Sequence, residues 1–106
     1  MNHERLKKLR EWEMEKPDDP FLKFAIAQEF VSDANDTEAA VYYTMLANNF
    51  PDYLPLYYQF GQLKERNGEI EEAIRLYKKG IQLAKTTGDV KTAHELNRAL
   101  IMLDDE

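Results

Sequence analysis

Few residues in this chain have the types and spacing that catalysis or metal binding requires. His94, Glu95 and Arg98 belong to the string HELNR, which matches the zinc motif HExxH at every fixed position but the last. That motif works because two imidazoles one helical turn apart bind the same zinc ion, and a guanidinium cannot be the second ligand. The other histidine, His3, lies at the opposite end of the chain. We therefore expect no metal site.

Two weaker patterns also fail. The string DANDTE, which begins at Asp33, resembles the start of a calcium-binding loop but lacks glycine at the sixth position and glutamate at the twelfth. Ser32 is the only serine and has no histidine near it in sequence, so a Ser–His–acid triad is not expected. The chain has no cysteine and no Gly-rich phosphate-binding loop. These features predict a protein that is not an enzyme and has no catalytic residues and no cofactor.

The composition describes a small folded domain with an uneven charge. The chain has 106 residues, of which 43% are hydrophobic and 11% aromatic, and its net charge is −6. Residues 17–56 hold seven acidic side chains and one basic side chain, Lys23, and such a surface repels nucleic acid. No run of about 18 apolar residues could span a membrane, and the N-terminus is too charged for a secretory signal. We expect a soluble cytoplasmic protein that binds neither nucleic acid nor membrane.

Periodicity and capping residues predict six helices and no strand. Apolar side chains recur at three- and four-residue spacing, and the segments are separated by prolines, glycines and capping aspartates or asparagines. The expected helices cover residues 3–16, 20–33, 36–49, 55–66, 69–85 and 89–104. Trp12 is expected to pack in the core under the terminal helix, with a binding role as the alternative.

The middle of the chain repeats itself with a period of 34 residues. Ala39 and Ala73 occupy equivalent positions, as do Tyr43 and Tyr77. Further identical pairs at the same separation are Pro17/Pro51, Asp18/Asp52, Leu22/Leu56, Gln28/Gln62 and Glu38/Glu72. Such repetition indicates one helical hairpin that is used twice.

The stretch from Leu54 to Thr87 resembles a tetratricopeptide repeat, a 34-residue helix–turn–helix unit. The resemblance rests on large and small residues at the family's positions, namely Tyr57, Phe60, Gly61, Gly68, Ala73, Tyr77 and Gly80. Lys64 departs from the pattern, since the family usually has tyrosine there. The resemblance implies an all-α fold, a right-handed superhelix of antiparallel helix pairs, in a single domain that covers residues 1–106. Residues 20–53 and 54–87 would be full repeats, 3–16 a half repeat and 89–104 a capping helix, and these caps lead us to expect a complete chain.

The resemblance also implies a protein–protein interaction module, an adaptor or scaffold that binds a partner's peptide or helix in a concave groove lined by the first helix of each repeat. The family's ligand-contacting positions map onto Phe21, Phe24, Gln28, Val31, Tyr58, Gln62, Glu65 and Arg66. The aromatic rings would anchor apolar groups, and the glutamines would hydrogen-bond a peptide backbone. The alternative is that Phe24 and Tyr58 pack beneath the terminal helices and that Gln28 and Gln62 are only solvated. A C-terminal carboxylate is not the expected ligand, because Phe24 and Gln28 stand where the family's carboxylate clamp has lysine and asparagine.

Self-association is the alternative function. The run Leu100–Ile101–Met102–Leu103 is apolar on more than one face of its helix, and an end helix of this kind can complete another copy's solenoid. The expected partner is therefore another protein, of unknown identity, or a second copy of this chain in a homodimer.

Overall fold

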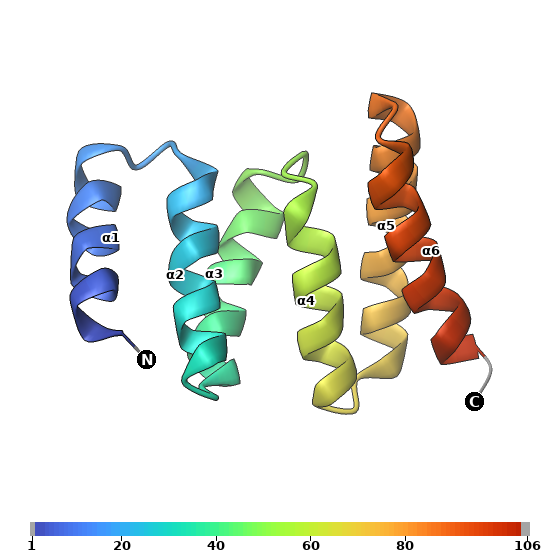
Figure 1. The fold of residues 1–106 in the computed structure, drawn as a ribbon, viewed down its shortest axis with the longest axis horizontal. Helices are drawn as coiled ribbons and strands as arrows, with labels where there is room; N and C mark the ends of the chain where they lie inside the picture. The colour runs from blue at the N-terminus through green and yellow to red at the C-terminus, as the bar shows by residue number, and fades with distance from the viewer. Residues whose placement is uncertain (1, 105–106) are drawn as a thin grey trace. The chain divides into compact units, whose positions relative to one another are not determined.

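The computed structural model describes residues 2–104, which form helices joined by short turns and contain no strand (Figure 1). The helices are α1 (His3–Glu15), α2 (Pro20–Ser32), α3 (Asp36–Asn49), α4 (Pro55–Arg66), α5 (Ile70–Thr87) and α6 (Val90–Asp104). They pack as antiparallel pairs, with α2 against α3, α4 against α5 and α5 against α6. The prediction of an all-α fold with antiparallel helix pairs is confirmed, and no predicted helix boundary is wrong by more than two residues.

The chain divides into two compact units. The first unit, Met1–Tyr53, contains α1, α2 and α3, and the second unit, Leu54–Glu106, contains α4, α5 and α6. The division coincides with the point where the 34-residue register separates the two repeats. Each unit has its own core.

Side chains that precede the helices start them by accepting backbone hydrogen bonds. These caps are Asn2 before α1, Asp19 before α2, Asn35 before α3 and Asp89 before α6. Each cap satisfies an amide of the first turn that has no partner within the helix. The Asp89 carboxylate accepts from the Thr92 N–H at 3.1 Å and from the Thr92 hydroxyl at 2.8 Å. These two bonds hold the pKa of Asp89 below its usual value.

The turn inside each repeat contains one residue in the left-handed conformation. In the second repeat this residue is Gly68, with φ of 78°, and in the first repeat it is Ala34, with φ of 56°. The two residues are 34 positions apart, so the same turn is built once with glycine and once with alanine. A β-carbon in this conformation costs about 1–2 kcal/mol. The first turn therefore carries backbone strain that the second avoids.

The core of the first unit lies mainly between α2 and α3. Its fully buried side chains are Ile26, Ala27, Ala39, Tyr43 and Leu46. α1 covers α2 with two buried leucines, Leu6 and Leu9. Two ion pairs hold α1 in place, Arg5–Glu29 at 2.9 Å and Glu13–Lys23 at 3.2 Å.

Trp12 does not lie in the core, and the prediction that it would is wrong. Its side chain is 49% exposed. The reason is that α1 packs against α2, and the face it turns toward α2 is filled by Leu6 and Leu9. Trp12 lies near the end of α1, where it borders a small hollow together with Leu22.

In the second unit, two glycines let the helices approach closely. A β-carbon at Gly61 would lie 2.7 Å from Cδ1 of Tyr77. A β-carbon at Gly80 would lie 2.7 Å from Cβ of Tyr57 and 2.8 Å from Cδ1 of Leu96. Such distances are shorter than real contacts, so neither site has room for a side chain. The small residues that the 34-residue pattern requires therefore mark the points where α4, α5 and α6 meet.

Candidate functional site

The binding residues predicted on α2 differ in their exposure. Phe21 is 56% exposed, Gln28 is exposed and Val31 is partly buried. Phe24 is only 8% exposed, and its ring centroid lies 6.1 Å from that of Tyr43 and 5.5 Å from that of Tyr53. The ring of Phe24 thus belongs to an aromatic cluster inside the first unit. Of the predicted binding residues on α2, Phe21 and Gln28 are the ones whose side chains are exposed to solvent.

The binding residues predicted on α4 share one face of their helix. Tyr58, Gln62, Glu65 and Arg66 are spaced at i, i+4, i+7 and i+8, which places them on adjacent turns. Arg66 is exposed and the other three are partly buried. We call this set the α4 stripe. It contains an aromatic ring, an amide, a carboxylate and a guanidinium, which together can contact both the backbone and the side chains of a peptide.

A tyrosine from α5 holds the middle of the α4 stripe. The Gln62 side-chain amide donates to the Tyr77 hydroxyl at 2.7 Å, and that hydroxyl donates to Glu65 Oε2 at 2.8 Å. The Tyr58 ring lies 6.3 Å from the Tyr77 ring. Burial of Tyr77, together with its hydrogen bond to the Glu65 carboxylate, raises the pKa of the phenol far above its usual value. The hydroxyl is therefore protonated at neutral pH and can donate to the Glu65 carboxylate.

The hydrogen-bonded chain leaves polar atoms of the α4 stripe available to a ligand. Among the described residues, Gln62 uses one of its two N–H groups and keeps the other, along with its carbonyl oxygen. Within the same residues, Glu65 uses one carboxylate oxygen and keeps the second. The sequence pattern predicted Tyr77 only as a core residue. Gln62 and Glu65 precede it by 15 and 12 residues, and no pattern in the sequence indicates that its hydroxyl group contacts them. The core prediction is correct, and the structure adds this second role.

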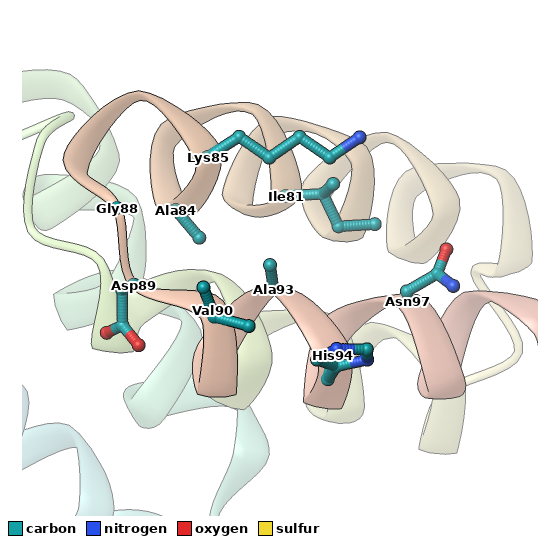
Figure 2. A pocket seen from close by; sticks show the side chains of 9 residues that line it. All are labelled: Ile81, Ala84, Lys85, Gly88, Asp89, Val90, Ala93, His94 and Asn97. Carbon is teal, nitrogen blue, oxygen red and sulfur yellow. The ribbon is translucent and has the colours of Figure 1, made fainter.

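A groove between α5 and α6 is a second candidate site that the sequence did not reveal. Its volume is about 400 Å³. The lining residues are Ile81, Ala84 and Lys85 from α5, Gly88 and Asp89 from the turn, and Val90, Ala93, His94 and Asn97 from α6. Figure 2 shows Ile81 and Ala84 pointing from α5 toward α6, and Ala93 and Asn97 pointing back toward α5. Val90 is 67% exposed although it shares the apolar spacing of α6, because α6 turns Leu96 and Leu103 into the core instead.

Within residues 2–104, no three His, Asp or Glu side chains are grouped so that they could hold a metal ion. No helix of the same region is long and apolar enough to cross a membrane.

Comparison with known proteins places the chain in a family. No family model matches the sequence, and no curated protein matches it. A crystal structure of a tetratricopeptide repeat domain protein from Salinibacter ruber does match, with 34% sequence identity and a TM-score of 0.79. The match covers 83% of this chain and 98% of the Salinibacter chain. This chain belongs to the tetratricopeptide repeat family.

Other solved structures agree with this assignment. A solution NMR structure of a tetratricopeptide repeat domain protein from Salinibacter ruber has 34% identity and a TM-score of 0.80, and the match covers 85% of this chain and 91% of that one. A solution structure of a protein from Bordetella parapertussis has a TM-score of 0.80 over 94% of this chain and 87% of its own, but its 18% identity shows likeness of fold alone. Tetratricopeptide repeat domains are typically protein–protein interaction modules and are generally not enzymes.

Proposed function

We propose that this tetratricopeptide repeat protein is a non-enzymatic adaptor that binds a peptide or helix of another protein through side chains on the first helix of each repeat, α2 and α4. The observation that carries the proposal is the hydrogen-bonded chain Gln62–Tyr77–Glu65, which orders part of the α4 stripe. Ordering a flexible side chain on binding costs about 0.5–1.5 kcal/mol. Gln62 and Glu65 avoid much of this cost because Tyr77 has already positioned them.

The α4 stripe suits a peptide backbone. Gln62 can donate to a peptide carbonyl with its remaining N–H and accept from a peptide N–H with its carbonyl oxygen. Tyr58 supplies an aromatic surface one turn away, where an apolar side chain of the ligand can pack. Arg66 is exposed at the end of the stripe.

In the first unit, Phe21 is the aromatic side chain that α2 presents to solvent, and Gln28 and Val31 follow it along the helix. We include these three in the proposed surface and leave out Phe24, whose ring the core already uses. The partner is proposed to be a protein because the acidic first repeat would repel nucleic acid. The absence of cysteine is in keeping with a cytoplasmic location.

An affinity capture experiment tests the proposal. Immobilised wild-type protein and a Tyr58→Ala variant are each incubated with lysate of the source cells, and bound proteins are identified by mass spectrometry. Gln82→Ala serves as the matched control because Gln82 is an exposed amide on α5. We expect the partner to be recovered by the wild type and by Gln82→Ala and to be lost with Tyr58→Ala. Equal recovery by all three proteins, each shown to be folded by circular dichroism, would refute a role for the α4 stripe.

The preorganisation step has its own test with the captured partner. Tyr77→Phe keeps the ring and removes only the hydroxyl that holds Gln62 and Glu65. Since a hydrogen bond contributes about 0.5–1.5 kcal/mol, Gln62→Ala should weaken binding by up to about tenfold. Tyr77→Phe should weaken it by a smaller factor, and its Gln62 side-chain NMR signals should lose their dispersion. Unchanged affinity in both variants would show that the ligand does not use this part of α4.

Self-association through the C-terminal helix is the second candidate function. Two neighbouring apolar side chains of α6 are exposed, Ile101 and Met102, and the latter is 66% exposed. Sedimentation at several concentrations measures the association state directly. A dimer that dissociates on Met102→Glu would support this candidate, and a monomer at every concentration would eliminate it.

A further inference from the structure

We propose that Glu65 of the α4 stripe binds a lysine or arginine side chain of the partner segment, so that the stripe selects basic peptides. This inference rests on the function proposed above, because it names the class of ligand that the same surface binds. Three observations carry it. The Glu65 carboxylate has no cation to pair with, Tyr77 holds it in place, and an aromatic ring, that of Tyr58, precedes it along the helix.

The Glu65 carboxylate has no cationic partner in the described part of the chain. Glu65 is partly buried, and its Oε2 accepts from the Tyr77 hydroxyl at 2.8 Å. Within residues 2–104 the carboxylate forms no ion pair and no other hydrogen bond. A carboxylate that has lost part of its hydration is stabilised by a charge-assisted hydrogen bond from an ammonium or guanidinium group. The second oxygen, Oε1, is therefore the acceptor that a ligand cation would use.

Neither of the basic residues next to Glu65 in sequence neutralises it. The Lys64 ammonium group pairs with Glu69 at 3.0 Å. Arg66 forms no ion pair with Glu65, and it follows Glu65 along the helix, whereas Tyr58 precedes it. A ligand cation that approaches along Tyr58 therefore reaches the Glu65 carboxylate before it reaches the Arg66 guanidinium.

The aromatic part of the stripe lies on the N-terminal side of the carboxylate. Tyr58 precedes Glu65 by seven residues, which is two helical turns or about 10 Å along the axis. The Tyr77 ring bridges this interval, since its centroid is 6.3 Å from that of Tyr58 and its hydroxyl is bonded to Glu65. Lysine and arginine have an apolar stem that can pack on an aromatic ring and a charged head that needs a polar partner. The order of ring and carboxylate on α4 matches the order of stem and head in a basic side chain.

The charge of the surrounding chain also favours a basic ligand. From residue 24 to residue 63 there is no lysine, arginine or histidine, and the net charge of the whole chain is −6. The only basic residue of α2, Lys23, is paired with Glu13 at 3.2 Å. An acidic protein attracts a cationic peptide and repels an anionic one. A peptide with an acidic side chain in place of the proposed cation would meet like charge at Glu65.

Short random peptides displayed on phage supply a probe that requires no knowledge of the partner. They are selected on the full wild-type chain, and only those that do not bind Tyr58→Ala are kept, which restricts the set to ligands of the α4 stripe. Circular dichroism checks that the variant is folded, and amide NMR shifts of the wild type locate the site independently. We expect the kept peptides to share a lysine or arginine at one recurring position. Each is then synthesised with the basic residue and with glutamine in its place.

Two variants with the same change in net charge test the contact with Glu65. Glu65→Gln removes the charge but keeps the shape of the side chain and an oxygen that can accept from Tyr77. Glu71→Gln is the matched control, because Glu71 is an exposed glutamate of α5. By fluorescence anisotropy, Glu65→Gln should weaken binding of the basic peptide by about three- to tenfold. The same variant should change the affinity of the glutamine peptide by less than about twofold, and Glu71→Gln should change neither affinity by more than that.

The outcomes separate a failure of this inference from a failure of the proposed function. Tyr58-dependent peptides that share no basic residue would overturn the inference and leave the α4 stripe as a binding surface. The same holds if the basic peptide binds Glu65→Gln as tightly as the wild type, or if Glu65→Gln and Glu71→Gln weaken it equally, because the cation would then respond only to overall charge. A selection that yields no Tyr58-dependent peptide, with no NMR shifts on α4, would refute the proposed function and this inference together.

Discussion

Replacing Gly61 with alanine should destabilise the second unit, although alanine is the better helix former. Helix propensity alone would favour alanine by about 1 kcal/mol. The new β-carbon, however, would lie 2.7 Å from Cδ1 and 2.8 Å from Cζ of Tyr77. The ring cannot move aside easily, because it is fully buried and its hydroxyl is bonded to Gln62 and Glu65.

The size of the effect follows from these opposing terms. Overpacking a close contact costs about 1–3 kcal/mol, and the rigidity of Tyr77 places this site toward the upper end. After subtraction of the gain in propensity, we expect Gly61→Ala to lower the free energy of unfolding by about 1–2 kcal/mol. For a protein of this length, each kcal/mol corresponds to a drop in Tm of about 4–8 °C.

Urea unfolding followed by circular dichroism measures this loss. The double-mutant cycle with Tyr77→Leu isolates its cause, because leucine has no ring to meet the new β-carbon. Gly61→Ala should cost at least about 1 kcal/mol less in the Tyr77→Leu background than in the wild type. If Gly61→Ala is as stable as the wild type, or costs the same in both backgrounds, the contact with Tyr77 is not what requires glycine here.

Three further predictions follow from local geometry. Ala34→Gly should raise the free energy of unfolding by about 0.5–1 kcal/mol, because it removes the strain of φ at 56° while making the unfolded chain more flexible; urea unfolding checks this, and a loss of stability would contradict it. Ala73→Leu should lower the free energy of unfolding by about 1–3 kcal/mol in the same assay, because Ala73 is fully buried. A variant as stable as the wild type would contradict close packing at this position. The pKa of Asp89 lies below its usual value, so its carboxylate stabilises the cap of α6 above the unfolded-state pKa and ceases to do so as pH falls through the folded-state pKa. In an NMR titration, Thr92→Val should raise the pKa of Asp89, and an unchanged pKa would show that the Thr92 hydroxyl does not contribute.

Much of the fold could be predicted because helix formation and repeat register depend on neighbours in sequence. The prolines and capping residues located the helix ends to within two residues. The 34-residue spacing identified Ala73 and Tyr77 as core residues, and both are fully buried. Pairs of small and large residues carry this information because close helix packing requires them at fixed positions in every repeat.

The candidate binding residues could be placed on the correct helices but not at the correct depth. Phe24 and Tyr58 are equivalent by register, yet Phe24 is buried among Tyr43 and Tyr53 while Tyr58 is partly exposed. Their depths differ because the residues that surround them come from other segments of the chain. Trp12 was misassigned for a similar reason, since its burial depends on how much of α1 is covered.

The amino-acid sequence by itself determined the helices, their order, the register of the repeats and the family, because periodicity, caps and the sizes of side chains are local properties. Only the tertiary structure decided how α6 turns about its axis, and so which of its apolar side chains face inward and which line the groove with α5. It also decided that the hydroxyl of Tyr77 ends between Gln62 and Glu65. The orientation of α6 and the hydrogen bonds of Tyr77 both depend on contacts between residues that are distant in sequence. The periodicity of the sequence does not specify such contacts.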